Sequence, residues 1–366
     1  MCDVPALRFP EFTGEWERHK LSEVCSFYSG GTPSSSKKEY YNGNIPFIRS
    51  GELHKDYTEL FITEAGLSNS AAKLVETGDL LLALYGATSG DIAISKIKGA
   101  INQAILCIRT KQNKKFIESV WNKHVERLLQ TYLQGGQGNL SADIVKNIPF
   151  YFANSNEQDK LAKFISLLDE RIATQNKIIE KLETLIKGIR NNIIFKIKGD
   201  CIALQDIADI YQPQTIASTD LTEEGYLVYG ANGVIGKYHS YNHEKEQICI
   251  TCRGNTCGTV NFTEPKSWIT GNAMVINTDN YAKNVNKRYL FHYLSSINFN
   301  SIISGSGQPQ IVRQPLAKLK LILPVLIIQN RIAECLDAMF AKMKNEQSFL
   351  QILQIQKSCL LSQMFI

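Results

Sequence analysis

The feature that most constrains this chain is a long helical heptad pattern that occurs twice. Between residues 157 and 195, apolar side chains recur at alternating spacings of four and three, and only Gln175 interrupts the series. A sustained heptad seam requires a partner helix. At 1.5 Å per residue this helix would be roughly 55 to 60 Å long. The seam consists of Leu161, Ile165, Leu168, Ile172, Ile179, Leu182, Ile186, Ile189 and Ile193.

The partner helix is expected in the same chain. A shift of 171 residues places Gln158 on Gln329 and sets a second apolar series on the same frame. Because the two helices are nearly equal in length, an intramolecular antiparallel coiled coil is favoured over a bundle core or a homodimer seam. Ser155 and Gln158 suit a capping box at the start of the first helix. The second seam consists of Ile332, Leu336, Met339, Met343, Leu350, Leu353, Leu360 and Met364.

The segments that precede the two helices form a second repeat. Residues 79–93 align with 247–261, which places Gly86 on Gly254 and Gly90 on Gly258. Residues 21–34 align in the same way with 204–217, and 135–140 with 306–311. Short apolar runs at 44–53, 78–86, 90–94 and 104–109 predict strands, and 116–134 predict a helix.

Together these patterns predict an α+β fold with a pseudo-twofold internal repeat. Two similar mixed α/β domains would be separated by two long helices paired as an antiparallel coiled coil. The expected boundaries are 1–154 for the first domain, with an N-terminal segment at 1–20, and 155–198 for the first helix. The second domain is expected at 199–324 and the second helix at 325–366.

Composition narrows the class of protein. The 366 residues are 44% hydrophobic and 20% charged, which indicates a globular chain, and the net charge of +5 permits an anionic partner without requiring one. The nine cysteines have no framework of spacings, which favours a reduced, cytoplasmic protein. Because there is neither an apolar run of membrane-spanning length nor a signal pattern, we expect neither membrane insertion nor export.

The sequence matches motifs of catalytic sites only incompletely. Residues 230–237 (GANGVIGK) resemble a phosphate-binding loop, but Tyr238 follows where Ser or Thr should hold magnesium, so a hairpin turn is favoured. The two NIPF sequences at 44–47 and 147–150 resemble an adenine methyltransferase element, but each lacks its first proline and fits the entry to a strand better. No nucleophile and base arrangement is evident, and we expect neither catalytic residues nor a cofactor.

Three cysteines leave one alternative open. Cys249, Cys252 and Cys257 have zinc-like spacing, but Cys249 and Cys252 would point to opposite faces of a strand, and no second CxxC supplies the remaining ligands. We therefore expect no metal. An enzyme with an unrecognised metal site near Cys249–Cys257 remains an alternative, as does a coiled-coil scaffold whose ends bind protein.

Signals of nucleic-acid binding recur beside equivalent glycines in both domains. Lys and Arg neutralise phosphates, while Asn, Gln and Arg can read base edges. Glycine lets the backbone approach a ligand closely. The candidates in the first domain are Lys37, Lys38, Tyr40, Tyr41, Asn42, Arg49, Tyr85 and Gln137. Those in the second are Tyr229, Asn232, Lys237, Tyr238, Arg253, Asn255, Gln308 and Arg313.

Four features together resemble the specificity subunits of type I restriction-modification systems. They are LRFPEFTGEWE at 7–17, the Glu157-Gln158 helix start, the repeat with divergent loops, and KSCLLSQMF at 357–365. One departure is Ile328, which occupies the position that Glu157 has in the first helix. The resemblance covers essentially the whole chain.

This resemblance implies a non-catalytic reader of double-stranded DNA. Two target recognition domains would each read one half of a bipartite site, and the paired helices would set the spacing and dock two modification (methyltransferase) subunits. ATP-dependent motor and nuclease activity would belong to restriction subunits. The resemblance also implies that residues 1–20 pack near the end of the second long helix.

Overall fold

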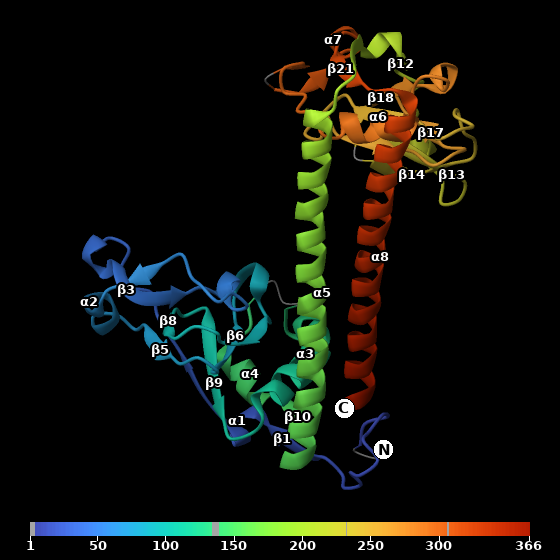
Figure 1. Cartoon of the computed structure of the whole chain (residues 1–366). Coiled ribbons are helices and arrows are strands. Elements are labelled where there is room, and N and C mark those ends of the chain that lie inside the picture. Colours follow the sequence, from blue (N-terminus) through green and yellow to red (C-terminus); the bar gives the residue numbers. More distant parts are fainter. Residues whose placement is uncertain (1–3, 134–138, 232, 306) are drawn as a thin grey trace. The chain divides into compact units, whose positions relative to one another are not determined.

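The computed structural model describes residues 4–133, 139–231, 233–305 and 307–366 (Figure 1). It contains two compact units. Unit 1 consists of residues 1–176 and 349–366, and unit 2 of residues 177–348. The long helices α5 (Ser155–Lys196) and α8 (Leu326–Met364) each contribute to both units. None of the helices in the described ranges is long and apolar enough to cross a membrane.

Unit 1 contains two four-stranded sheets and a two-stranded ribbon. One sheet, of order β2-β9-β6-β7, is antiparallel and consists of β2 (Cys25–Ser29), β6 (Leu80–Ala83), β7 (Ile92–Ile94) and β9 (Ile105–Thr110). The other, of order β4-β3-β8-β5, consists of β3 (Tyr41–Ile48), β4 (Phe61–Ile62), β5 (Lys73–Val75) and β8 (Gly99–Ile101). Strands β3 and β8 run parallel. The ribbon pairs β1 (Glu17–Lys20) with β10 (Pro149–Phe152).

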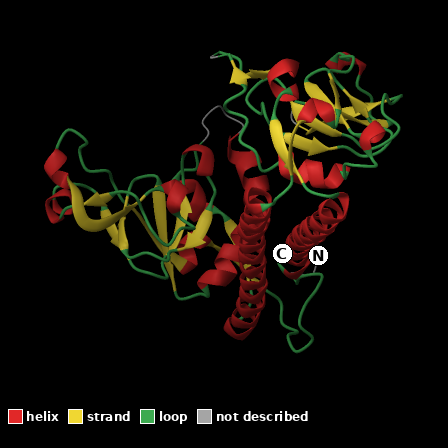
Figure 2. Cartoon of the chain, turned by 45° about the horizontal axis from the view of Figure 1, so that its top comes forward, coloured by secondary structure: helices red, strands yellow, loops and turns green. Residues whose placement is uncertain are grey.

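The apolar strand faces of unit 1 are buried on two sides. Between the two sheets lies a core that includes Ile48 and Leu81. On the other face of the first sheet, Leu82 packs with Trp121 of α3 (Lys114–Leu133) and with residues of α5 and α8. Three short helices, α1 (Leu21–Val24), α2 (Glu64–Ser68) and α4 (Ala142–Asn147), complete the unit. Figure 2 distinguishes the helices (red) from the strands (yellow).

Unit 2 repeats this plan. Its first sheet, of order β12-β18-β15-β16, consists of β12 (Asp209–Tyr211), β15 (Ile248–Thr251), β16 (Val260–Phe262) and β18 (Ala273–Asn277). Its second, of order β14-β13-β17, consists of β13 (Tyr226–Gly230), β14 (Gly233–Tyr238) and β17 (Trp268–Ile269). Strands β13 and β17 are parallel, as β3 and β8 are in unit 1. The predicted internal repeat is therefore confirmed.

The remaining elements of unit 2 also have counterparts. The ribbon pairs β11 (Asp200–Ala203) with β21 (Lys320–Leu323), and helices α6 (Lys287–Leu294) and α7 (Arg313–Ala317) follow the order of α3 and α4. A short hairpin, β19 (Ile303–Ser304) with β20 (Gln310–Ile311), has no named counterpart among the described residues of unit 1.

The two long helices pair antiparallel, as predicted. In unit 1, Asp169 near the start of α5 is 2.5 Å from the Nζ of Lys357 near the end of α8. In unit 2, Ile194 near the end of α5 shares a core with Ile332 and Leu336 near the start of α8. Every predicted seam residue is buried or partly buried.

The start of α5 corrects one detail of the prediction. The Oδ1 of Asn154 accepts a hydrogen bond from the amide of Glu157 at 3.0 Å, so the capping residue is Asn154 rather than Ser155. Gln158 closes no capping box with Ser155, because its Nε2 donates to the carbonyl oxygen of Ala153 at 2.7 Å. The side chain of Asn154 therefore caps the first turn of α5, where backbone amides have no partner within the helix.

The N-terminal segment packs against both long helices within unit 1. The amide of Leu7 donates to the carbonyl oxygen of Gln363 at 2.9 Å. Arg8 forms a two-pronged ion pair with the buried Glu157, at 2.7 Å for both hydrogen bonds. Ile328, which replaces the acid in the second helix, packs instead against the apolar core of unit 2.

Candidate nucleic-acid interface

A tight glycine turn follows the second strand of the main sheet in each unit. Gly86 and Gly254 have φ of +77° and +83°, and Gly90 and Gly258 have φ of +87° and +92°. Only glycine adopts these angles without strain. The amide of each later glycine donates back to the strand, at 2.9 Å in unit 1 and 2.8 Å in unit 2. The repeat therefore extends to the backbone of this turn.

In each unit, a segment later in the chain forms a backbone hydrogen bond just before this turn. The amide of Leu140 donates to the carbonyl oxygen of Leu84 at 2.9 Å, and that of Ile311 donates to Cys252 at 3.0 Å. The predicted correspondence of 135–140 with 306–311 is confirmed at these last residues, whereas 135–138 and 306 lie outside the described residues. Each turn is thus bordered by a second loop.

Three loops meet at the turn of unit 2. The hydroxyls of Thr251 and Thr256 donate to the carbonyl oxygen of Ala231, at 2.8 and 2.6 Å, which fixes the β13–β14 hairpin against the glycine turn. The amide of Gly254 donates to the carbonyl oxygen of Pro309 at 3.0 Å, which fixes the third loop. The exposed members of this loop junction are Arg253, Asn255 and Gln308.

The corresponding loop junction of unit 1 has a different composition. His54 Nε2 lies 2.9 Å from Asp91 Oδ1, which holds the segment around η2 (Ser50–Glu52) beside the glycine turn. Arg49 precedes η2, and Tyr85 precedes the turn and is 37% exposed. The structure therefore places the η2 segment, which Arg49 precedes, beside the turn that Tyr85 precedes. Gln137 lies outside the described residues, as does Asn232 in unit 2.

The remaining exposed candidates lie at the other end of the same strands. Lys37 and Lys38 lie just before β3 and Asn42 lies at its start, whereas Arg49 follows its end. Lys237 and Tyr238 pair with residues at the start of β13, whereas the loop junction lies at its end. The sequence-predicted set therefore divides into two groups in each unit.

Burial removes two tyrosines from that set. Tyr40 and Tyr229 are 7% exposed, and the hydroxyl of Tyr229 accepts a hydrogen bond from the amide of Glu264 at 3.1 Å. Burial also raises the pKa of Tyr229. Tyr41 is half-buried, and its hydroxyl donates to the carbonyl oxygen of Pro33 at 2.5 Å. These three rings stabilise the loops and offer little surface to a ligand.

Two arginines of the set are bound within the protein. Arg49 pairs with Glu52 at 2.8 Å and with Glu59 at 3.0 Å. Burial would raise the pKa of Glu52, but hydrogen bonds from Arg49 and Thr58 outweigh it and lower this pKa to about 2. Arg313 Nε donates to the carbonyl oxygen of Ile210 at 2.6 Å. In the loop junction of unit 2, Arg253, Asn255 and Gln308 thus remain exposed candidates for base contacts.

Sequence reasoning missed the residues that position the loops. The partners of Thr251, Thr256, His54 and Asp91 lie 20 to 37 residues away in the sequence. A signal was present in part, because Thr251, Thr256 and Asp91 lie within the segments that the repeat aligned, and both threonines lie within the Cys249–Cys257 motif. Side-chain contacts across loops depend on tertiary geometry that sequence spacing does not encode.

The sequences that resembled a phosphate-binding loop or a zinc site have structural roles. Strands β13 and β14 form the predicted hairpin, with Gly230 opposite Gly233. Cys249 and Cys252 lie in different apolar cores, and burial raises the pKa of Cys249 to about 12. No group of three or more His, Cys, Asp or Glu residues is arranged to hold a metal ion in the described ranges.

Comparison with known proteins gives consistent matches over both units. Residues 13–184 and 200–354 each match the model of the type I restriction modification DNA specificity domain. The specificity subunit of the type I restriction enzyme EcoprrI of Escherichia coli is 25% identical over 369 residues, which span 93% of this chain and 90% of that protein.

Solved structures share the fold. The S subunit of a type I restriction-modification system from M. genitalium matches with a TM-score of 0.68 at 16% identity, over 99% of both chains. A chain from a structural study of complex assembly and conformational transition in the type I R-M system matches with a TM-score of 0.60 at 15% identity, over 96% of this chain and 97% of that one.

Proposed function

Because this chain belongs to the type I restriction-modification DNA specificity family, we propose that it is the subunit that reads the DNA sequence for a type I complex. The observation that carries the proposal is the pair of equivalent loop junctions. Their backbones correspond, turn for turn, while their exposed side chains differ: Arg49 and Tyr85 in unit 1, and Arg253, Asn255 and Gln308 in unit 2. Two copies of one scaffold with different surfaces suit a site with two different halves.

Each loop junction would enter the major groove of one half-site. Arg253 can donate two hydrogen bonds to guanine, and Asn255 or Gln308 can pair with adenine. Exposed lysines such as Lys37 and Lys237 would contact phosphates, which orients the domain without specifying sequence. We propose the regions 1–154 and 199–324 as the two target recognition domains.

The long helices would separate these domains and dock the other subunits. Outside the seam, α5 exposes Leu167 and Leu185, and α8 exposes Ile352 and Ile355. Neighbouring exposed apolar side chains, such as Ile352 and Ile355 about one helical turn apart, favour a protein contact. Two modification subunits would bind there and supply methyl transfer, while ATP-driven cleavage would belong to restriction subunits. The chain itself would be non-catalytic and would act in the cytoplasm, with double-stranded DNA.

The proposal is tested by the methylation pattern that the chain directs. The chain and the modification subunit of its system are expressed in a host without adenine methylation, and methylated adenines are sequenced. We expect one bipartite motif with a fixed gap. Arg253→Ala should relax one half of the motif only, because each lost base contact costs about 1–3 kcal/mol of discrimination.

Lys245→Ala, which removes an exposed cation of unit 2 outside the loop junction, is the matched control and should leave the motif unchanged. A motif without a gap, or one whose two halves both change in Arg253→Ala, would contradict the proposal.

A further inference from the structure

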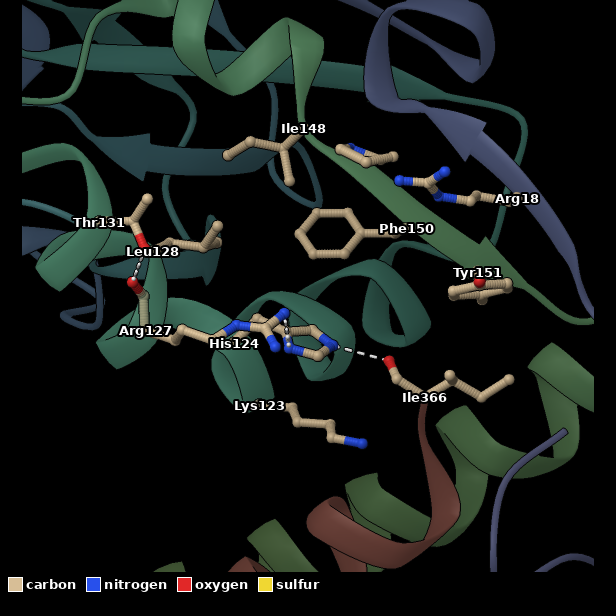
Figure 3. A pocket seen from close by; sticks show the side chains of 11 residues that line it. Arg18, Lys123, His124, Arg127, Leu128, Thr131, Ile148, Phe150, Tyr151 and Ile366 are labelled. Carbon is tan, nitrogen blue, oxygen red and sulfur yellow. Dashed lines mark hydrogen bonds between the residues drawn. The ribbon is translucent and has the colours of Figure 1, made fainter. Parts of the chain in front are cut away.

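Unit 1 contains a basic hollow outside the loop junction. It has a volume of about 720 Å³ and lies between the β1–β10 ribbon, the second half of α3 and the end of the chain (Figure 3). Arg18, Lys123 and Arg127 line it with His124, and Phe150 lies between Arg18 and the residues of α3. No carboxylate side chain of the described residues lines the hollow.

Two of these four basic side chains are bound to the main chain. Lys123 donates to the carbonyl oxygen of Phe365, and His124 Nε2 lies 2.7 Å from a main-chain oxygen of Ile366, the last residue of the printed sequence. Arg18 and Arg127 form no ion pair with any described residue. Burial, and then the charge of Arg127, lower the pKa of Lys123. Like charges gathered in this way repel one another, and an anion would relieve the repulsion.

Unit 2 provides an internal control for the role of these charges. In the equivalent ribbon, Cys201 occupies the place of Arg18, since each belongs to the second residue pair of its ribbon. Helix α6 ends at Leu294, before the turn in which α3 carries Lys123 and Arg127. The same fold therefore forms without cations at the positions of Arg18, Lys123 and Arg127, although Lys320 of unit 2 occupies the place of Pro149. The charges of unit 1 are not a requirement of the scaffold.

The composition of the hollow fits a protein segment better than DNA. Its lining also includes the exposed Pro149 and the half-buried Tyr151 and Ile366, and a bare phosphate backbone would gain nothing from such apolar surface. Helix α3 separates the hollow from the loop junction, because Val125 and Leu129 lie against Gly90, while the next faces of the helix line the hollow.

We propose that this hollow binds an acidic segment of a partner protein, whose carboxylates pair with Arg18 and Arg127 while an apolar side chain covers Tyr151. Guanidinium groups match carboxylates with two parallel hydrogen bonds. Because unit 2 has no counterpart of Arg18 or Arg127, one chain binds one such segment, even where two copies of the partner are present. The proposal rests on the proposed function only in taking the partner from the same complex.

Charge reversal tests the site. The probe is the purified modification subunit of the same system. Its Kd is measured for the wild-type chain and for the variant Arg18→Glu/Arg127→Glu. The control variant, Lys73→Glu/Lys111→Glu, reverses two exposed cations elsewhere in unit 1. We expect binding at least about tenfold weaker for the first variant alone. The affinity of each chain for a duplex that carries its recognised site should stay within about twofold.

Unchanged subunit binding would overturn the proposal, and so would a loss of DNA affinity with subunit binding intact, which would assign the hollow to DNA. If the charge-reversed chain loses its cooperative unfolding transition, Arg18→Gln/Arg127→Gln replaces it under the same criteria. Failure of wild type to prefer its DNA site would contradict the proposed function but not this site, so the two failures are distinguishable.

Crosslinking identifies the occupant. In the assembled complex with DNA, p-benzoylphenylalanine replaces Tyr151 beside the hollow, or Ile322 at the matched position of the second ribbon. We expect Tyr151→p-benzoylphenylalanine to crosslink to a segment of a protein subunit that is rich in Asp or Glu, and the Ile322 probe not to reach that segment. A crosslink to DNA, or equal crosslinking of that segment from both positions, would contradict the proposal.

Discussion

Gln158 and Gln329 make the same hydrogen bonds at the starts of the two long helices. Each side chain donates to the main-chain oxygen five residues earlier, at 2.7 and 2.8 Å. Gln158 also accepts from the amide of Asn113 at 3.1 Å, and Gln329 accepts from that of Asn286 at 2.8 Å. In both units a buried amide thus joins the long helix to the cap of the shorter helix packed beside it.

Replacing either glutamine should destabilise its own unit. Gln158→Ala or Gln329→Ala leaves a buried amide and a buried carbonyl without partners, which costs about 1–3 kcal/mol. Chemical denaturation followed by circular dichroism should show this loss, while Gln351→Ala at an exposed position of α8 should change stability by less than about 0.5 kcal/mol. Equal stability of all three variants would show that these bonds are not structural.

Substitutions in the glycine turn should differ in cost. Gly86→Ala meets no atom within 4 Å, so its penalty is the strain of a positive φ, about 1–2 kcal/mol. In Gly90→Ala the new methyl would lie 2.9 Å from Val125 Cγ2, which adds steric conflict. The unfolding temperature of Gly90→Ala should therefore be lower than that of Gly86→Ala. Gly51→Ala, with open space and no positive φ, should match wild type, and the reverse ranking would contradict the turn geometry.

The stability of unit 1 should fall in acid partly through Glu52. Its pKa is about 2 in the folded chain, below the ordinary value of 4.5, because hydrogen bonds from Arg49 and Thr58 outweigh burial. A lowered carboxyl pKa contributes stability that is fully present above about pH 4.5 and is lost as the pH falls towards 2. Glu52→Gln should remove a contribution on the order of 2–3 kcal/mol at pH 7 and flatten this part of the pH profile.

The control is Glu15→Gln at an exposed position near the start of β1, which should leave the profile unchanged. A profile in Glu52→Gln as steep as that of wild type would show that the Arg49 pair does not stabilise the fold.

Shortening both long helices should shorten the gap between the half-sites. Removal of one heptad from each helix, residues 171–177 and 348–354, keeps the seam in register and shortens the pair by about 10 Å, or about three base pairs. Sequencing of methylated adenines should show the same half-sites with a narrower gap. Removal from one helix alone should break the register and abolish methylation. Altered half-sites with an unchanged gap would show that the helices do not set the spacing.

The long helices and the repeat could be predicted because both leave a local imprint. The heptad spacing indicates a partner helix along the whole length of each long helix. Gly86 and Gly254 mark the same turn, which requires glycine, in both copies. Antiparallel pairing followed from the nearly equal lengths of the helices and their places after each domain. These features depend on spacing along the chain, which the sequence displays.

The side-chain contacts of the candidate interface could not be predicted in the same way. Tyr40 seemed a surface ring, but it is buried, and Arg49 is held by Glu52 and Glu59. Residue type alone does not tell an exposed cation from a paired one. The basic hollow brings Arg18 beside Arg127, more than a hundred residues later in the chain, through the pairing of β1 with β10 and the packing of α3. No motif records such an encounter.

A domain exchange separates the two halves of the proposed reader. Residues 205–320 are replaced by the equivalent segment of a relative with a known site, and methylated adenines are sequenced in a host that supplies the modification subunit. We predict that one half of the bipartite motif changes to that of the relative, while the other half and the gap stay as in wild type. A functional hybrid in which both halves change, or in which neither does, would contradict the assignment of one half-site to each unit.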